Sequence, residues 1–137
     1  MKNGLALSTV LGLAMLAACA QSPPPPGQKL AAAELAKVEF NATAIGSDSY
    51  ENFAIYTAPD GTFAIKMGSV DDTGTYKITD DGHVCLKYHK AFGGNEYCNT
   101  IYRDGQTYRA VAPNGAIVGT YTMTPGNPRN LQTAGAR

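Results

Sequence analysis

Residues 80–111 read DDGHVCLKYHKAFGGNEYCNTIYRDGQTYRAV, and this stretch decides the fold. Its runs of β-prone residues are separated by Asp-Gly at 81–82, Gly-Gly at 93–94 and Asp-Gly at 104–105. Asp-Gly readily adopts the positive φ values of a two-residue hairpin turn, and Gly-Gly makes a looser turn. The stretch therefore predicts consecutive antiparallel strands that are joined by short turns.

The same pattern continues on both sides of this stretch. Asp-Gly at 60–61 and Asn-Gly at 114–115 mark two more hairpin turns. The predicted strands are 53–57, 62–67, 74–79, 83–88, 96–103, 107–111 and 117–122, with 42–45 as an eighth candidate. A meander of seven or eight short strands in so short a chain curls on itself. We therefore predict an all-β fold, a small antiparallel meander that closes into a barrel or a strongly curved sheet, with a sandwich as the alternative.

One short helix precedes the strands. Residues 30–38, LAAAELAKV, are rich in Ala and Leu, and Glu34 and Lys37 stand three residues apart. Leu35 and Val38 can share one face of this helix, so we expect it to pack across one end of the domain.

Two segments are predicted to lack regular structure. Residues 68–74, GSVDDTG, are polar and acidic, and they are predicted to form the longest loop of the meander. The segment after Met123 has two prolines and little apolar content, so we expect its last several residues to be disordered.

The cysteines at 85 and 98 occupy equivalent positions on the two strands that flank Gly-Gly at 93–94. A register that places Lys87 opposite Glu96 also places Cys85 opposite Cys98. Directly opposed residues on one face of a sheet are close enough for an S–S bond, so a disulfide is predicted. The alternatives are two reduced, buried thiols and a catalytic cysteine, for which no activating base is recognisable nearby.

The N-terminus carries an export signal. Lys2 lies in a short charged start, and residues 4–18 have no charge and consist mostly of Leu, Ala, Val and Met. Such a segment is typical of a secretory signal and too short for a comfortable membrane span. It ends in LAAC at 16–19, which resembles the lipobox of bacterial lipoproteins. The resemblance implies cleavage between Ala18 and Cys19 and lipidation of Cys19; an ordinary signal peptide with a free Cys19 is the alternative.

The remaining cysteines and the linker agree with a lipid anchor. The chain has three cysteines, and lipidation of Cys19 leaves Cys85 and Cys98 as an even pair in an oxidising compartment. Residues 21–29, QSPPPPGQK, favour an extended spacer. The Ala-Gln that follows the lipobox lacks the aspartate that retains many lipoproteins at the inner membrane. The resemblance therefore implies the outer membrane, facing the periplasm.

These features divide the chain into four parts. The predicted parts are a signal peptide at 1–18, a lipidated cysteine and proline-rich linker at 19–29, a β domain with its leading helix at 30–125, and a C-terminal tail at 126–137.

The chain shows no recognisable catalytic or metal-binding motif. Its formal net charge is zero, which gives no electrostatic footprint for nucleic acid. His83, Cys85 and His89 form H-x-C-x-x-x-H, but an extended strand separates the two histidines by ~20 Å, too far for one metal ion. The acidic pairs at 71–72 and 80–81 fall at predicted turns, and no G-x-S-x-G elbow exists. We therefore predict no catalytic residue, no metal and no cofactor, hence a protein that is not an enzyme.

Tyrosine is the one residue type that suggests a binding surface. Some of the eight tyrosines must lie in the core, and a cluster on an exposed face could bind a glycan or a protein. They are Tyr50, Tyr56, Tyr76, Tyr88, Tyr97, Tyr102, Tyr108 and Tyr121.

Residues 30–131 carry a series of short motifs in a fixed order. They are L-x-A-x-E-L at 30–35, Y-x-x-P-D-G-T at 56–62, G-T-Y at 74–76, D-G-x-x-C at 81–85, a second cysteine strand with R-x-G-x-x-Y at 98–108, and G-N-P at 126–128. The series resembles a loose family of small exported proteins of unknown function, found mainly in alphaproteobacteria, with Tyr76 where Trp is common. The resemblance implies an all-β domain with one disulfide, and it implies no activity.

Three functions are weighed from these observations. The first is a non-enzymatic envelope module that binds a protein or glycan partner from its lipid tether, and an exposed tyrosine patch would favour it. The second is a periplasmic inhibitor of a protease or lysozyme, which a projecting rigid loop such as 68–74 would favour. The third is an enzyme acting on envelope polymers, which needs a deep pocket with two acidic residues or a Tyr–Asp pair. We predict the first.

Overall fold

The computed structural model describes residues 25–136 of the chain. The predicted cleavage site at Ala18 and lipidation site at Cys19 lie outside the described residues. Within the described part, no helix is both long and apolar enough to cross a membrane. The elements in chain order are β1 (Gln28–Lys29), α1 (Ala32–Glu39), β2 (Ala42–Ser47), β3 (Asn52–Thr57), β4 (Thr62–Met67), β5 (Val70–Ile78), β6 (His83–Tyr88), the 3-10 helix η1 (Ala91–Gly94), β7 (Glu96–Asp104), β8 (Thr107–Val111), β9 (Ile117–Pro125) and the 3-10 helix η2 (Ala134–Ala136).

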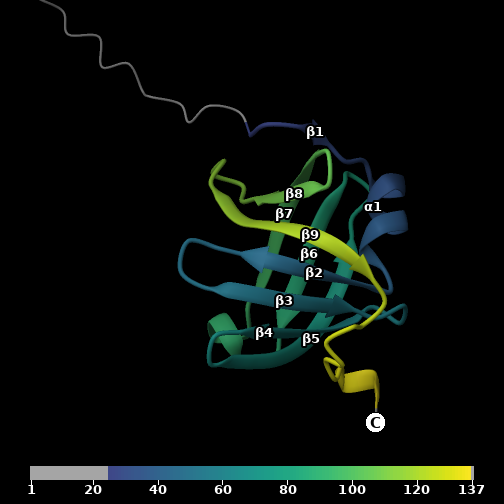
Figure 1. Cartoon of the computed structure of the whole chain (residues 1–137), viewed down its shortest axis with the longest axis vertical. Helices are drawn as coiled ribbons and strands as arrows, with labels where there is room; N and C mark the ends of the chain where they lie inside the picture. The colour runs from purple at the N-terminus through teal and green to yellow at the C-terminus, as the bar shows by residue number, and fades with distance from the viewer. Residues whose placement is uncertain (1–24, 137) are drawn as a thin grey trace, which may run out of the picture.

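Strands β2 to β9 form a closed antiparallel barrel (Figure 1). Each strand pairs with the next along the chain, and β2 also pairs with β9, which closes the meander. The ninth strand, β1, lies outside this circle on the edge of β7. The predicted all-β barrel with one short helix is thus confirmed, and the sandwich alternative is excluded.

The predicted Asp-Gly and Asn-Gly turns fall between strands, but the prediction that they are two-residue turns is wrong for β3–β4 and β5–β6, whose connections span 58–61 and 79–82. The glycine of each has a positive φ, for example +83° at Gly61. The predicted loop at 68–74 is wrong, because β5 begins at Val70, directly opposite Met67 of β4. Its acidic residues belong to the strand: Asp71 lies opposite Lys66, an opposite-charge pair that supports the sheet.

Helix α1 begins later than the sequence suggests. Leu30 continues from β1 instead, and its N–H donates to the carbonyl of Ile101 at 2.9 Å. The side chain of Glu34 accepts the N–H of Ala31 at the start of the helix. Leu35 is fully buried, and the helix packs across one end of the barrel as expected.

The C-terminal segment is more ordered than expected. The hydroxyl of Thr43 on β2 donates to the carbonyl of Gly126 at 2.7 Å. The side chain of Asn127 makes two hydrogen bonds to the backbone of Leu131, and Thr133 is buried. The predicted disorder is therefore not found up to η2, because the segment folds back onto the outer face of β2 to β4.

Because neighbouring strands are antiparallel, their connections alternate between the two ends of the barrel. We call the end covered by α1 the helix end; the β3–β4, β5–β6 and β7–β8 turns lie there. We call the opposite end the loop end; it carries the β2–β3, β4–β5, β6–β7 and β8–β9 connections.

The interior of the barrel is filled by large apolar and aromatic side chains. Alternate residues of every strand point inward, as the two-residue period of a strand requires. The buried core consists of Leu30, Leu35, Ala44, Phe63, Ile65, Tyr76, Val84, Ile101, Tyr108 and Tyr121.

Candidate binding surface

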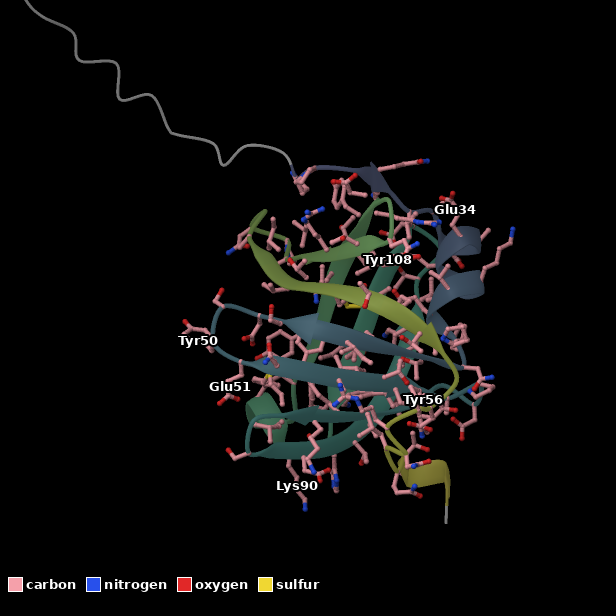
Figure 2. The ribbon with its side chains drawn as sticks, in the orientation of Figure 1. Glu34, Tyr50, Glu51, Tyr56, Lys90 and Tyr108 are labelled. Carbon is pink, nitrogen blue, oxygen red and sulfur yellow. A yellow bond between two sulfur atoms is a disulfide. The ribbon has the colours of Figure 1, made fainter. Side chains whose placement is uncertain are left out.

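Large apolar side chains are exposed at the loop end of the barrel. Within residues 25–136, the exposed large hydrophobic residues are Tyr50 (91%), Tyr97 (46%), Phe92 (45%), Ile117 (43%) and Val118 (40%). They come from the β2–β3 connection, from η1, and from the first residues of β7 and β9. Figure 2 shows Tyr50 at the tip of the β2–β3 connection, away from the barrel wall. We call these five residues the apolar rim.

Phe92 holds an unusual backbone conformation in this rim. Its φ of 53° and ψ of 34° lie in the left-handed region, where a bulky residue is a rare outlier. Such a conformation costs about 1–3 kcal/mol, and it persists only where the surroundings enforce it. Here the side chain of Asn95 donates to the carbonyl of Phe92 at 3.0 Å.

A buried carboxylate holds the turn that contains Phe92. Asp72 on β5 accepts the N–H groups of Lys90 and Ala91 at 2.9 and 2.8 Å. Burial raises the pKa of Asp72, but these two donors and the N–H of Thr73 together outweigh burial, so its pKa lies below the ordinary value. Asp72 therefore stays ionised at neutral pH and fixes the position of the strained turn.

The exposed rings are continuous with the core through Tyr88. Its ring centroid lies 5.2 Å from that of Phe63, which is fully buried, and 4.8 Å from that of Phe92. Phe92 and Tyr97 lie 6.1 Å apart, and their planes make an angle of 77°. The two exposed rings thus form a corner and not a flat platform.

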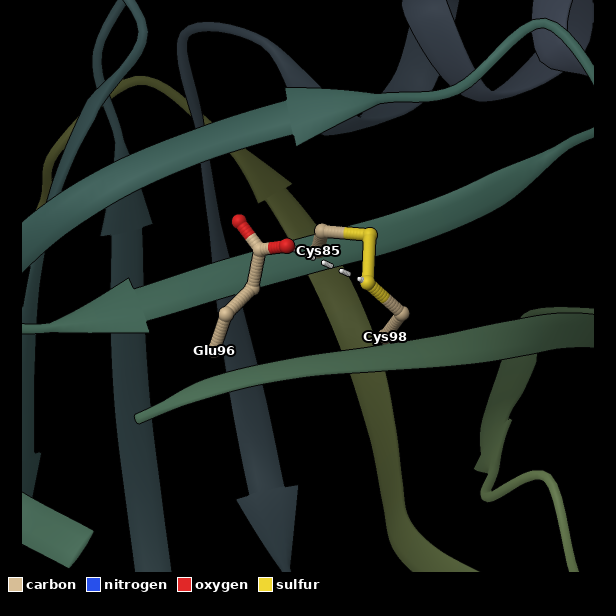
Figure 3. Close-up of side chains that lie close together, drawn as sticks. All are labelled: Cys85, Glu96 and Cys98. Atoms are coloured by element: carbon tan, nitrogen blue, oxygen red, sulfur yellow. Dashed lines mark hydrogen bonds between the residues drawn. A yellow bond between two sulfur atoms is a disulfide. The ribbon is translucent and has the colours of Figure 1, made fainter. Parts of the chain in front are cut away.

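The cysteine strands have the predicted register. Cys85 lies opposite Cys98, Leu86 opposite Tyr97, and Lys87 opposite Glu96. The two sulfur atoms lie 2.03 Å apart, at disulfide distance, on the outer face of the barrel (Figure 3).

Glu96 completes a group of three possible metal ligands with these cysteines (Figure 3). Its Oε1 lies 3.8 Å from the Sγ of Cys98, but a disulfide sulfur carries no hydrogen and is no thiolate. Glu96 pairs instead with the Nζ of Lys77 at 3.1 Å. The group is therefore a surface ion pair beside a crosslink.

The histidines lie far apart, as the strand geometry predicted. His83 is the first residue of β6, and its Nδ1 lies 3.1 Å from Asp81 Oδ2. The hydrogen bonds from Thr79 and His83 lower the pKa of Asp81 to about 2. His89 follows the other end of β6, where its N–H donates to the carbonyl of Thr73.

Two hollows flank the C-terminal segment on the outer face of the barrel. The larger, about 590 Å³, is lined by both apolar and basic side chains, including Lys66 and Arg129. The smaller, about 390 Å³, includes Tyr56 and Asp60, the residue types that an enzyme would need. Their polar groups are engaged elsewhere, because Asp60 accepts the N–H and hydroxyl of Thr62 and Tyr56 donates to Asn41. They do not form an acid–base pair.

The structure divides the tyrosines between core and surface. Tyr76, Tyr108 and Tyr121 are buried inside the barrel, whereas Tyr50 and Tyr97 belong to the apolar rim. The other rim residues were not foreseen from the sequence. The one signal in the sequence was Phe92, because a simple hairpin turn does not require an aromatic residue next to Gly-Gly at 93–94.

Comparison with known proteins does not place the chain in a family. No family model matches it, and no solved structure matches it. One curated protein, "Probable RNA-dependent RNA polymerase 3" from Arabidopsis thaliana, is 33% identical over 70 residues. This similarity covers 49% of the chain and only 7% of that plant protein. It therefore carries no argument about activity.

Proposed function

We propose that the protein is a non-enzymatic binding module of the cell envelope that holds a protein partner through its apolar rim. One observation carries the proposal: the exposed large hydrophobic residues of the described chain all lie at one end of the barrel. Concentrated apolar surface on a folded domain is typical of a binding site, and aromatic residues are enriched in protein interfaces.

The shape of the rim favours a protein over a glycan. Sugars stack on the face of an aromatic ring, and a polysaccharide needs several faces in one plane. Phe92 and Tyr97 are nearly perpendicular to each other, and Ile117 and Val118 offer no ring. A corner of two rings suits an apolar side chain of a protein partner.

The strain at Phe92 also supports a binding role. A glycine or asparagine at position 92 would adopt the left-handed backbone at less cost. The phenylalanine there packs on Tyr88 at 4.8 Å and still leaves 45% of its surface exposed. Backbone strain of this kind concentrates at functional sites.

We further propose that Cys19 is lipidated and anchors the module to the outer membrane, facing the periplasm. The lipobox LAAC and the proline-rich linker support the anchor. The linker meets the barrel at the helix end, where Gln28 and Lys29 pair with Arg103 and Tyr102. Along β7, Tyr97 lies about 17 Å from Tyr102, so the rim points away from the attachment point.

The alternative function, inhibition of a hydrolase, gains no support from the segment that would favour it. A projecting rigid loop at 68–74 would have supplied an inhibitory element. Strand β5 occupies most of that segment, and only Gly68 and Ser69 separate it from β4.

The binding proposal is tested by photocrosslinking from the two ends of the barrel. A photoreactive phenylalanine analogue at Tyr50 samples the apolar rim, and the same analogue at Lys37 on α1 samples the helix end. In intact cells we expect a discrete protein adduct from position 50 and none from position 37. The Phe92→Asn substitution, which tolerates the left-handed backbone, should reduce the adduct at position 50 at least about tenfold, as for a residue at the centre of an interface.

Two results would contradict this proposal. The same adducts from both positions, or none from position 50, would mean that the rim is not a specific binding site. An adduct that a muramidase digests would identify a glycan and refute the protein partner.

The anchor is tested by metabolic labelling with palmitate. We expect Cys19→Ser to abolish the label and to release the protein from the membrane fraction. Cys98→Ser is the matched control, and it should keep the label. Label that survives Cys19→Ser would refute the lipid anchor without affecting the binding proposal.

A further inference from the structure

Helix α1 buries a carboxyl group against the barrel. Glu39, its last residue, lies one turn after Leu35 and on the same face. Leu35 is fully buried, and Glu39 is only 5% exposed. A glutamate is almost never buried to this degree unless it is paired with a cation.

Among residues 25–136, the side chains that face Glu39 offer hydroxyl groups and no cation. Tyr121 on β9 donates to its Oε1 at 3.2 Å. Tyr76 on β5 faces the same carboxyl, although its hydroxyl makes no hydrogen bond of ordinary geometry. Tyr108 on β8 stacks on Tyr121 at 5.6 Å. Strand β2, which also packs on the helix, has no titratable residue.

These surroundings favour the protonated carboxyl. An ionised carboxylate can accept about four hydrogen bonds, and this one has a single hydroxyl donor at hydrogen-bond distance. Burial raises the pKa of Glu39, the hydroxyls of Tyr121 and Tyr76 lower it only in part, and the pKa lies at about 7 as a result. The pKa of each tyrosine is raised by burial, so both hydroxyls keep their protons throughout this range.

Two further contacts join Glu39 to the rest of the helix end. Phe40, the next residue, packs edge-on against the ring of Tyr76 at 5.4 Å. Leu30, which precedes the helix, belongs to the same buried core and follows directly from β1. A change at Glu39 therefore acts on the packing of α1 against the barrel.

We infer that Glu39 is a proton-operated latch, which holds α1 on the barrel when the carboxyl is protonated and loosens α1 when it ionises. The inference does not depend on the proposed binding function.

The direction of the effect follows from proton linkage. When α1 is lifted and Glu39 is solvated, its pKa returns to near 4.5, whereas the packed carboxyl has a pKa of about 7. As the pH rises from 4.5 to 7, the open form loses its proton first, so the equilibrium moves toward opening. Below pH 4.5 the closed form of α1 has its full stability relative to the open form. Above pH 7 the opening equilibrium no longer changes with pH.

Hydrogen exchange of the α1 amides tests the latch in the full-length protein, purified in detergent. Between pH 5 and pH 8.5 we expect the protection factors of residues 35–39, corrected for intrinsic exchange, to fall by on the order of a hundredfold. Protection of the amides in β4 and β5 should stay constant. The Glu39→Gln substitution should remove the pH dependence, whereas Glu51→Gln, at an exposed carboxyl, should leave it unchanged.

A second variant separates a latch from a merely structural glutamate. Tyr121→Phe removes the hydroxyl that lowers the pKa of Glu39, so the midpoint of the α1 transition should move to higher pH. If Glu39→Gln does not fold, the carboxyl of Glu39 is titrated by NMR in the unmodified protein, and its midpoint should coincide with the loss of α1 protection. Protection that is independent of pH, or that follows a different midpoint, would overturn the inference.

Discussion

Phe63→Ala is expected to lower the free energy of unfolding by about 3–5 kcal/mol, because it empties the centre of the barrel. Phe63 is fully buried, and its ring packs edge-on against Tyr88. The ring also covers Gly74, which lies directly opposite on β5. A methyl group at residue 74 would lie 2.6 Å from Cε1 of Phe63, and Gly74 itself has no side chain to fill the space when the ring is removed.

Urea unfolding followed by far-UV circular dichroism measures this effect. Tyr50→Ala is the control, because Tyr50 is 91% exposed; a surface change of this kind should stay within about 0.5 kcal/mol. If Phe63→Ala lowers the free energy of unfolding by less than about 1 kcal/mol, the barrel collapses around the gap, and Phe63 is not the side chain that fills its centre.

Removing the crosslink is expected to have the second largest effect. The double substitution Cys85→Ala and Cys98→Ala should cost about 3 kcal/mol in the chain-entropy model, because the crosslink closes a loop between residues 13 positions apart. Replacing both residues avoids a free thiol beside Glu96. The measurement is urea unfolding with and without reductant.

Reductant supplies the control for this prediction. It should lower the stability of the unmodified protein to that of the double variant and leave the variant unchanged. Cys19→Ser should behave like the unmodified protein, because Cys19 takes no part in the crosslink. Free thiols at Cys85 and Cys98 in non-reducing mass spectrometry would refute the disulfide.

A stable barrel is what the strained turn at Phe92 in the proposed binding surface requires. The core and the crosslink supply the stability against which the left-handed backbone at Phe92 is maintained. Natural proteins commonly give up some stability at sites of function. The two stability predictions test the core and the disulfide crosslink, and the photocrosslinking experiment tests the apolar rim.

The strands and turns could be predicted because their signals are local. Asp-Gly and Asn-Gly favour tight turns through their own backbone preferences, which do not depend on distant parts of the chain. The register of the cysteine strands followed from one turn, and it is confirmed at Cys85 and Cys98. The segment 68–74 was predicted incorrectly, because its acidic residues have low β propensity. Pairing of Asp71 with Lys66, and of Asp72 with the backbone at Lys90 and Ala91, overrides that propensity.

The candidate sites were harder to predict than the fold. Periodicity cannot show that Glu39 is buried, since a glutamate at the end of a helix is normally exposed. Nor does it reveal that Tyr50, Phe92 and Ile117 lie at the same end of the barrel, because three different connections bring them there.

The amino-acid sequence by itself determined the turns, the strands between them and the opposition of the two cysteines, since each depends on neighbours within one hairpin. Only the tertiary structure decided the closure of β9 on β2, the folding of the C-terminal segment onto the barrel and the burial of Glu39. These features depend on contacts between residues about 80 positions apart, for example the 82 that separate Glu39 from Tyr121. Such contacts form because closing the barrel pairs the backbone N–H and C=O groups of its edge strands and removes its apolar face from water. No local sequence pattern encodes this gain in free energy.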